Sequence, residues 1–266
     1  MPHVFMRATK VGYQDHGGAG IPIVLVHAFP LDSTMWQGQI DALSGNHRFV
    51  TVDLQGFGTS DAPEDESGYS MGEFADQIKA VIDEIGADKV VLVGLSMGGY
   101  VAFEFWRRYR ERVAALVLAD TRAEADPPEG KDKRSAQQQQ VREQGTSGLI
   151  EALTGALLGE QTRTNKPEVV DAAKKSMANP DAGFIGALEA MKNRPDSSED
   201  LTTIDVPTLV IVGENDGVTP PEAARKIHEH VGGSQLVVIP EVGHLSNLEA
   251  PEDFNRALED FLTQFK

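Results

Sequence analysis

Short apolar runs alternate with helical patterns along most of this 266-residue chain. The runs cover residues 21–28, 47–53, 89–96, 113–120, 206–216 and 234–244. Runs that are apolar at nearly every position are typical of parallel strands buried on both faces of a sheet. Residues 4–14, followed by the glycine-rich turn DHGGAG, predict an N-terminal hairpin that adds two more strands. The alternation therefore predicts an α/β fold with a mostly parallel, eight-stranded sheet flanked by helices.

Residues 121–203 interrupt this alternation, because they contain no strand-like run. The polar segment 121–144 is typical of an exposed crossing, and the apolar residues beyond it recur at helical spacing. We therefore expect a core domain formed by residues 1–120 and 204–266, with residues 121–203 forming a helical cap inserted after the sixth strand. Ligands of open α/β sheets bind at the carboxyl ends of the strands, and we expect the cap to cover that edge.

The overall charge and the absence of cysteine exclude several classes of function. Lys and Arg number 24 against 41 Asp and Glu, a net charge of −17, which repels phosphate backbones and anionic lipid. We expect no nucleic-acid and no membrane partner. A chain without cysteine has no disulfides and no thiolate chemistry. The N-terminus lacks the apolar core of a signal peptide, so we expect a cytoplasmic protein. The sequence leaves open whether it is a monomer or a homo-oligomer.

Ser96 lies in the pentapeptide GLSMG, between a predicted buried strand and a predicted helix. In this setting the G-x-S-x-G pattern forms a sharp strand–turn–helix reversal that exposes the serine hydroxyl. Glycines two residues before and after the serine relieve backbone clashes, and the helix N-terminus directs N–H groups to the same place. We predict Ser96 as a nucleophile; the alternative is a glycine-rich turn with an incidental serine.

A serine hydroxyl is a weak nucleophile and needs a general base. His244 follows the last predicted strand, in a loop at the carboxyl edge of the sheet that also carries Ser96. We predict His244 as the base. The other histidines lie in early loops, at the end of a buried strand or in a charged helix: His3, His16, His27, His47, His228 and His230. The spacing of two in the charged helix places its pair on different faces, so we predict no metal site.

The base in turn needs a carboxylate that orients it. Asp216 follows the penultimate predicted strand, and Asp120 ends the strand at 113–120; Asp53 and Glu214 are further options. The chain order Ser, Asp, His favours Asp216, because it is the order of triad partners in α/β-hydrolases. Asp120 remains an alternative acid, since the sequence does not give the distance between its side chain and His244.

Acyl transfer also needs backbone N–H donors for the developing oxyanion. We predict one donor from Met97, directly after the predicted nucleophile. The other is expected from the loop HAFP at residues 27–30, where Phe29 is the candidate.

The chain resembles serine hydrolases of the α/β-hydrolase superfamily, nearest to the carboxylesterase, 3-oxoadipate enol-lactonase and cofactor-free haloperoxidase (perhydrolase) group. The matching segments run almost end to end: HAFPLDSTMW, VDLQGFGTSD, GLSMGG, LADTRAEAD, LVIVGENDGVTP and IPEVGHLSNLEAPEDFN. The resemblance implies the α/β-hydrolase fold with a cap, catalytic Ser96, Asp216 and His244, an oxyanion hole at Phe29 and Met97, and no cofactor.

The sequence departs from the pattern of this group at two positions. Ala28 stands where the group usually has glycine, so either the loop tolerates a side chain or the oxyanion hole is reshaped. Gln55 stands where the group often has arginine, which removes a cation near the carboxyl edge. Serine rather than aspartate at position 96 disfavours epoxide and haloalkane hydrolysis.

We therefore expect a serine carboxylesterase that hydrolyses small carboxylic esters through an acyl-enzyme intermediate. One alternative is an enol-lactonase acting on a carboxylate-bearing lactone, for which Arg122 is a candidate cation, with perhydrolase side activity. A non-enzymatic alternative is a ligand sensor that keeps the fold without turnover. The expected partner is a small-molecule ester or lactone.

Overall fold

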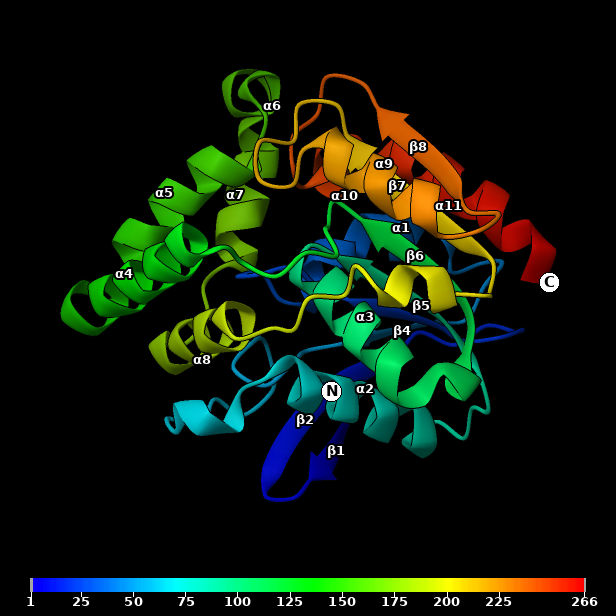
Figure 1. The fold of residues 1–266 in the computed structure, drawn as a ribbon, viewed down its shortest axis with the longest axis horizontal. Coiled ribbons are helices and arrows are strands. Elements are labelled where there is room, and N and C mark those ends of the chain that lie inside the picture. Colours follow the sequence, from blue (N-terminus) through cyan, green and yellow to red (C-terminus); the bar gives the residue numbers. More distant parts are fainter. Residues whose placement is uncertain (1, 266) are drawn as a thin grey trace.

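A central eight-stranded sheet organises the computed structural model, which describes residues 2–265 (Figure 1). The strand order is β1-β2-β4-β3-β5-β6-β7-β8. The strands are β1 (His3–Met6), β2 (Thr9–Asp15), β3 (Ile23–Val26), β4 (Phe49–Val52), β5 (Val90–Leu95), β6 (Val113–Ala119), β7 (Thr208–Gly213) and β8 (Gln235–Ile239). The pairs β1–β2 and β2–β4 are antiparallel, and every other pair is parallel. The predicted mostly parallel sheet is confirmed.

Helices cover both faces of the sheet. Outside the insertion they are α1 (Gln37–Leu43), α2 (Met71–Glu84), α3 (Met97–Tyr109), α9 (Pro221–His230), α10 (Ser246–Glu249) and α11 (Pro251–Leu262). Val90 and Leu92 of β5 are buried in one cluster with α2, α3 and α9, whereas Val91 and Val93 are buried in another with α1 and α11. Because alternate residues of a strand face opposite sides, burial of both faces requires the continuous apolar runs of the sequence.

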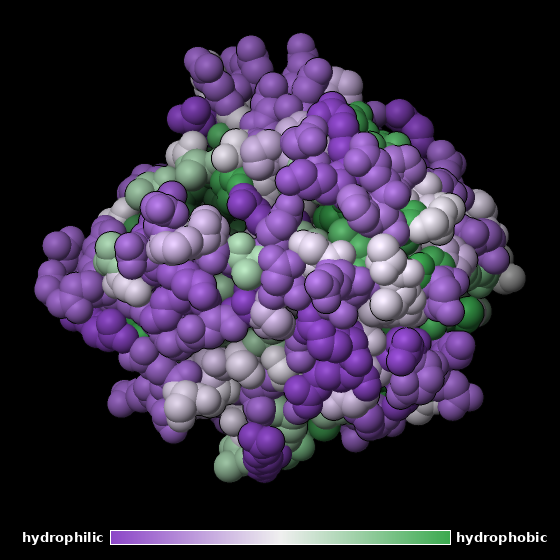
Figure 2. Space-filling view, viewed as in Figure 1, coloured by the Kyte–Doolittle hydropathy of each residue, from purple (hydrophilic) through white to green (hydrophobic). Residues whose placement is uncertain are grey.

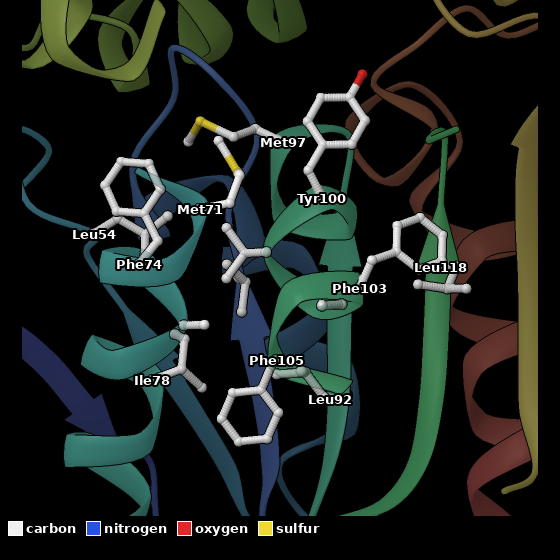
Figure 3. Packing of buried hydrophobic residues seen from close by; sticks show 14 of the residues in the cluster. Leu54, Met71, Phe74, Ile78, Leu92, Met97, Tyr100, Phe103, Phe105 and Leu118 are labelled. Carbon is white, nitrogen blue, oxygen red and sulfur yellow. The ribbon is translucent and has the colours of Figure 1, made fainter. Parts of the chain in front are cut away.

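The interior between α2, α3 and the sheet is built from large apolar side chains. Figure 3 shows Phe74 and Ile78 of α2 and Phe105 of α3 within this interior, and all three are buried. The start of α2 is capped by Ser70, whose hydroxyl accepts the N–H of Glu73 at 3.0 Å. The apolar packing between α2 and α3 holds α3 in place, and with it the turn that joins β5 to α3.

A helical insertion follows β6, as predicted. Its helices are α4 (Pro128–Gln144), α5 (Ser147–Leu157), α6 (Glu160–Asn165), α7 (Pro167–Ser176) and α8 (Asp181–Lys192). The polar segment expected as an exposed crossing is largely exposed from Pro127 onward, whereas Thr121 and Ala123 are buried. Most of the segment is helical, because α4 occupies its greater part. Pro at the first helical turn and a run of Gln, Lys and Arg favour a helix without an apolar stripe. Only Gln138 and Val141 of α4 are buried.

The insertion contacts loops at the carboxyl edge of the sheet. The side chain of Asn179 donates to the carbonyl of Pro30, after β3, at 3.0 Å and accepts the N–H of Gly58, after β4, at 2.8 Å. The N–H of His244, after β8, donates to the carbonyl of Leu157 at 3.0 Å. Loops from three strands are thereby tied to the insertion at the edge where α/β proteins bind ligands.

The face of the molecule seen in Figure 2 is mostly polar, and hydrophobic residues appear on it only in separated patches. None of the helices within residues 2–265 is long and apolar enough to cross a membrane.

Candidate active site

Ser96 occupies the sharp turn between β5 and α3. Its backbone has φ 56° and ψ −111°, in the positive-φ region that residues other than glycine rarely adopt. Its N–H donates to the carbonyl of Ala119 on β6, and its carbonyl accepts the hydroxyl of Thr121, both at 2.9 Å. The strained conformation is therefore held by hydrogen bonds to the neighbouring strand.

The glycines that flank Ser96 are required by close backbone approach. A Cβ atom on Gly94 would lie 2.2 Å from the carbonyl oxygen of Gly98. A Cβ atom on Gly98 would lie 2.3 Å from the carbonyl oxygen of Val26 on β3. Both distances are far below van der Waals contact, so the turn packs this closely only because neither residue has a side chain.

The structure brings together the predicted nucleophile, base and acid. The Nε2 atom of His244 lies 2.8 Å from Oγ of Ser96, and its Nδ1 atom lies 2.8 Å from Oδ2 of Asp216. All three residues are buried. Because a carboxylate only accepts hydrogen bonds, Nδ1 carries the proton and Nε2 is left to accept the proton of the serine hydroxyl.

Asp216 is held in place by its own turn. Its Oδ1 accepts the N–H groups of Val218 at 2.8 Å and Thr219 at 2.9 Å, and its Oδ2 accepts the Thr219 hydroxyl at 2.6 Å. The sequence analysis did not single out Thr219. The D-x-x-T spacing is its signal, because aspartate side chains bond backbone groups two or three residues later in such turns.

The ionisation of the pair follows from burial and mutual attraction. Burial alone lowers the pKa of His244, but the charge and hydrogen bond of Asp216 outweigh it and raise that pKa above its ordinary value. Burial alone raises the pKa of Asp216, but the charge and hydrogen bond of His244 and the bonds from Thr219 hold it below its ordinary value. The site therefore stabilises an imidazolium beside a carboxylate.

Asp120, the rival acid, has different partners. Its Oδ1 accepts the N–H of Gly213 at 2.8 Å, and its Oδ2 accepts the hydroxyl of Ser246. Among the hydrogen bonds of residues 2–265, none joins Asp120 to His244. Burial and the charge of Asp216 raise the pKa of Asp120 to about 8, so its carboxyl group is mostly neutral at pH 7. Asp120 therefore does not orient His244 in this arrangement.

The remaining acidic candidates, Asp53 and Glu214, and the histidine that follows β3, His27, have structural partners. Asp53 accepts the N–H groups of Ser33 and Thr59, both at 2.9 Å, and Glu214 accepts the N–H of Glu241 at 3.1 Å. His27 accepts the N–H of Leu54 at Nε2, at 3.1 Å, and donates from Nδ1 to the carbonyl of Ala28 at 3.0 Å. The described residues contain no group of three or more His, Asp or Glu side chains placed to hold a metal ion.

The two predicted oxyanion donors are unoccupied by other acceptors. Within the described part of the chain, the N–H groups of Phe29 and Met97 make no hydrogen bond to the protein. Met97 is the first residue of α3, where helical N–H groups have no intrahelical partner. Ala28 is not among the residues with positive φ, so the loop accepts alanine without backbone strain.

Comparison with known proteins agrees with the fold. The alpha/beta hydrolase fold family matches residues 21–251. A thermophilic esterase from Thermogutta terrifontis, solved with malate bound, is 37% identical and covers 100% of this chain and 99% of its own, with a TM-score of 0.93. The 3-oxoadipate enol-lactonase 1 of Acinetobacter baylyi is 28% identical over 96% of this chain and 94% of its own length. A bromoperoxidase from Bacillus anthracis is 25% identical, with 96% of each chain covered and a TM-score of 0.85.

The chain belongs to the alpha/beta hydrolase family. The predicted resemblance to a group of esterases, enol-lactonases and haloperoxidases is confirmed.

Replacement of each carboxyl group by an amide tests the choice between the two aspartates. We expect Asp216→Asn to lower ester turnover on the order of 10⁴-fold, because the amide no longer holds the Nδ1–H tautomer of His244. Asp120→Asn should stay within about tenfold of wild type, because its Oδ1 still accepts the N–H of Gly213 and its amide nitrogen donates to the hydroxyl oxygen of Ser246, reversing the bond that Asp120 accepts. Steady-state kinetics on both variants measures this; a larger loss for Asp120→Asn would reverse the assignment.

Proposed function

We propose that this protein is a serine carboxylesterase that hydrolyses small carboxylic esters. The observation that carries the proposal is the continuous hydrogen-bonded chain from Ser96 through His244 to Asp216, with both links at 2.8 Å. Such a chain is the arrangement by which a hydroxyl becomes a nucleophile in acyl transfer.

In the proposed reaction, His244 accepts the proton of Ser96 as Oγ attacks the ester carbonyl carbon. The N–H groups of Phe29 and Met97 bind the resulting oxyanion. The C–O bond to the alcohol then breaks, and the alcohol leaves with the proton from His244. A water molecule, deprotonated by His244, attacks the acyl-enzyme and releases the acid and free Ser96. Hydrogen peroxide in place of this water would release a peracid, and none of these steps requires a cofactor.

We also propose that residues 121–203 act as a cap on a core formed by residues 1–120 and 204–266. The contacts from the insertion to the loops after β3, β4 and β8 support this role. A cap at the carboxyl edge limits the size of the ester and excludes water from the oxyanion during attack.

Ser96→Ala tests the proposed function directly. Without the nucleophile we expect turnover of p-nitrophenyl butyrate to fall on the order of 10⁶-fold, as losses of this size accompany removal of a triad serine. Ser67→Ala is the matched control, because this exposed serine bonds only Asp65 in its own turn. Retained turnover in Ser96→Ala would contradict the proposal. A wild-type protein that forms an acyl-enzyme without steady-state turnover would instead indicate a ligand sensor.

The pH dependence of the rate follows from the state of the base. His244 accepts a proton only when neutral, and its pKa lies above the ordinary 6.5 because of Asp216. The rate should therefore fall as pH decreases, with the midpoint of the fall in kcat/KM above pH 6.5. A kcat/KM profile across the neutral range measures this midpoint, and a midpoint below 6.5 would contradict the role of Asp216.

A second candidate function, the hydrolysis of a carboxylate-bearing lactone, is favoured by Arg122. Its Nε is buried and has no hydrogen-bond partner among residues 2–265, while its Nη2 donates to the carbonyl of Val218. Val218 also donates its N–H to Asp216 at 2.8 Å, so the guanidinium lies beside the turn of the proposed acid, and its charge lowers the pKa of His244. A substrate carboxylate beside the scissile bond would supply the missing partner.

Arg122→Gln separates the two substrate classes. We expect KM for an enol-lactone with a free carboxylate to rise roughly tenfold or more, because a charge-assisted hydrogen bond is lost. The KM for a neutral ester should remain unchanged. Arg225→Gln is the control, since Arg225 lies on α9 and pairs with Glu222 at the surface. Equal effects of Arg122→Gln on both substrates would exclude an anion-binding role.

A further inference from the structure

Glu249 is a fully buried carboxylate that the reaction does not use. It lies at the end of α10, five residues after His244, and has no exposed surface. A buried carboxylate is costly unless donors surround it. The partners of Glu249 are therefore informative about its role.

The first carboxylate oxygen binds the backbone on both sides of His244. Oε1 accepts the N–H of Gly243 at 3.0 Å and the N–H of Leu245 at 3.3 Å. The N–H groups of the residues before and after the histidine are thus fixed to one atom. Small rotations of this backbone would change the direction of the imidazole ring.

The second oxygen binds the insertion. Oε2 accepts the N–H of Gly159 at 2.8 Å and the hydroxyl of Thr162 at 2.7 Å, at the start of α6. Lys166, after α6, donates to the backbone carbonyl of Glu249 at 2.7 Å. One side chain therefore joins the loop that carries His244 to the turn between α5 and α6.

The backbones themselves approach closely at this junction. A Cβ atom on Gly243 would lie 2.6 Å from the nitrogen of Gly159, and the N–H of His244 donates to the carbonyl of Leu157 at 3.0 Å. Two glycines thus permit direct contact between the insertion and the histidine loop. Every partner of the Glu249 carboxylate is a donor, which suits a group that accepts at both oxygens.

We propose that Glu249 is a positioning residue for His244, and that it makes the α5–α6 turn of the insertion part of the support of the proposed base. The inference rests on the proposed function, in which His244 activates Ser96. It assigns the insertion a role in the chemical step as well as in covering the site. Displacement of the α5–α6 turn would release one side of the histidine loop and misdirect Nε2 from Ser96.

Thr162→Val tests this inference at a distance from the chemistry. Valine keeps the shape of threonine but removes the hydroxyl that Glu249 accepts. Thr154→Val is the matched control, because Thr154 is also a buried threonine of the insertion, and its hydroxyl bonds Ile150 and Met177 within the insertion. We expect Thr162→Val to lower kcat roughly five- to tenfold with KM unchanged, since a misplaced base slows the chemical step. Thr154→Val should change neither.

Glu249→Gln provides a second, stronger variant. Glutamine replaces one acceptor oxygen with an amide nitrogen, which is a donor. This nitrogen would face N–H donors either in the histidine loop or at Gly159, so the hydrogen bonds on that side would be lost. We expect a loss in kcat of up to about 100-fold, as misplacement of reacting groups by about 1 Å has this cost. If this variant does not fold, Thr162→Val still decides the proposal.

Labelling of Ser96 by a fluorophosphonate separates the inference from the proposed function, because it requires an activated serine and no substrate turnover. In Thr162→Val the labelling rate should fall with kcat while the final labelled fraction stays at the wild-type level. A lower final fraction would indicate unfolding and would count against a positioning role. Equal rates in wild type and both Thr162→Val and Glu249→Gln, or equal losses in Thr162→Val and Thr154→Val, would overturn the inference. A wild type that labels but does not hydrolyse esters would contradict the proposed function alone.

Discussion

The close packing of the β5–α3 turn against its neighbouring strands is the constraint on which the site depends. Gly98 lies against the carbonyl of Val26, and Ser96 is bonded to Ala119 across the sheet. The turn fixes Ser96 in a strained backbone conformation. Helix α3, which begins directly after this turn, is held against the sheet by the buried apolar side chains that it shares with α2. The loops that carry His244 and Asp216 then place these side chains next to a serine whose position is already fixed by the turn.

Much of this arrangement was predictable because it depends on local rules. Continuous apolar runs predict strands buried on both faces, and the glycines around Ser96 indicate a turn with no room for side chains. Ser96, Asp216 and His244 each follow a predicted parallel strand, which predicts that they meet at the carboxyl edge of the sheet, and they lie within hydrogen-bonding distance there. Helix α4 was not predicted, and its segment was expected to be an exposed crossing, because its helix-forming residues are not accompanied by an apolar stripe.

Other features depend on distances that the sequence does not contain. Asp120 and Asp216 both follow strands at the same edge, and only the structure shows that Asp120 bonds Gly213 and Ser246 instead of the histidine. Glu249 is of a residue type common in helices, and its link to the insertion emerges only from partners about 90 positions away in the chain, Gly159 and Thr162. Long-range pairing of this kind leaves no pattern in a single sequence.

The contact between Gly159 and Gly243 has a consequence for the modularity of the fold. Such an insertion is a natural unit to exchange when substrate range is altered, because the chain enters and leaves it side by side, where the N–H of Ser197 donates to the carbonyl of Ala123 at 2.9 Å. Here a backbone hydrogen bond also joins the inserted segment to the loop after β8, and the side chain of Glu249 binds the backbone of the insertion. A graft from a relative would therefore have to reproduce the small residue and the hydroxyl of this junction, as well as the shape of a new pocket.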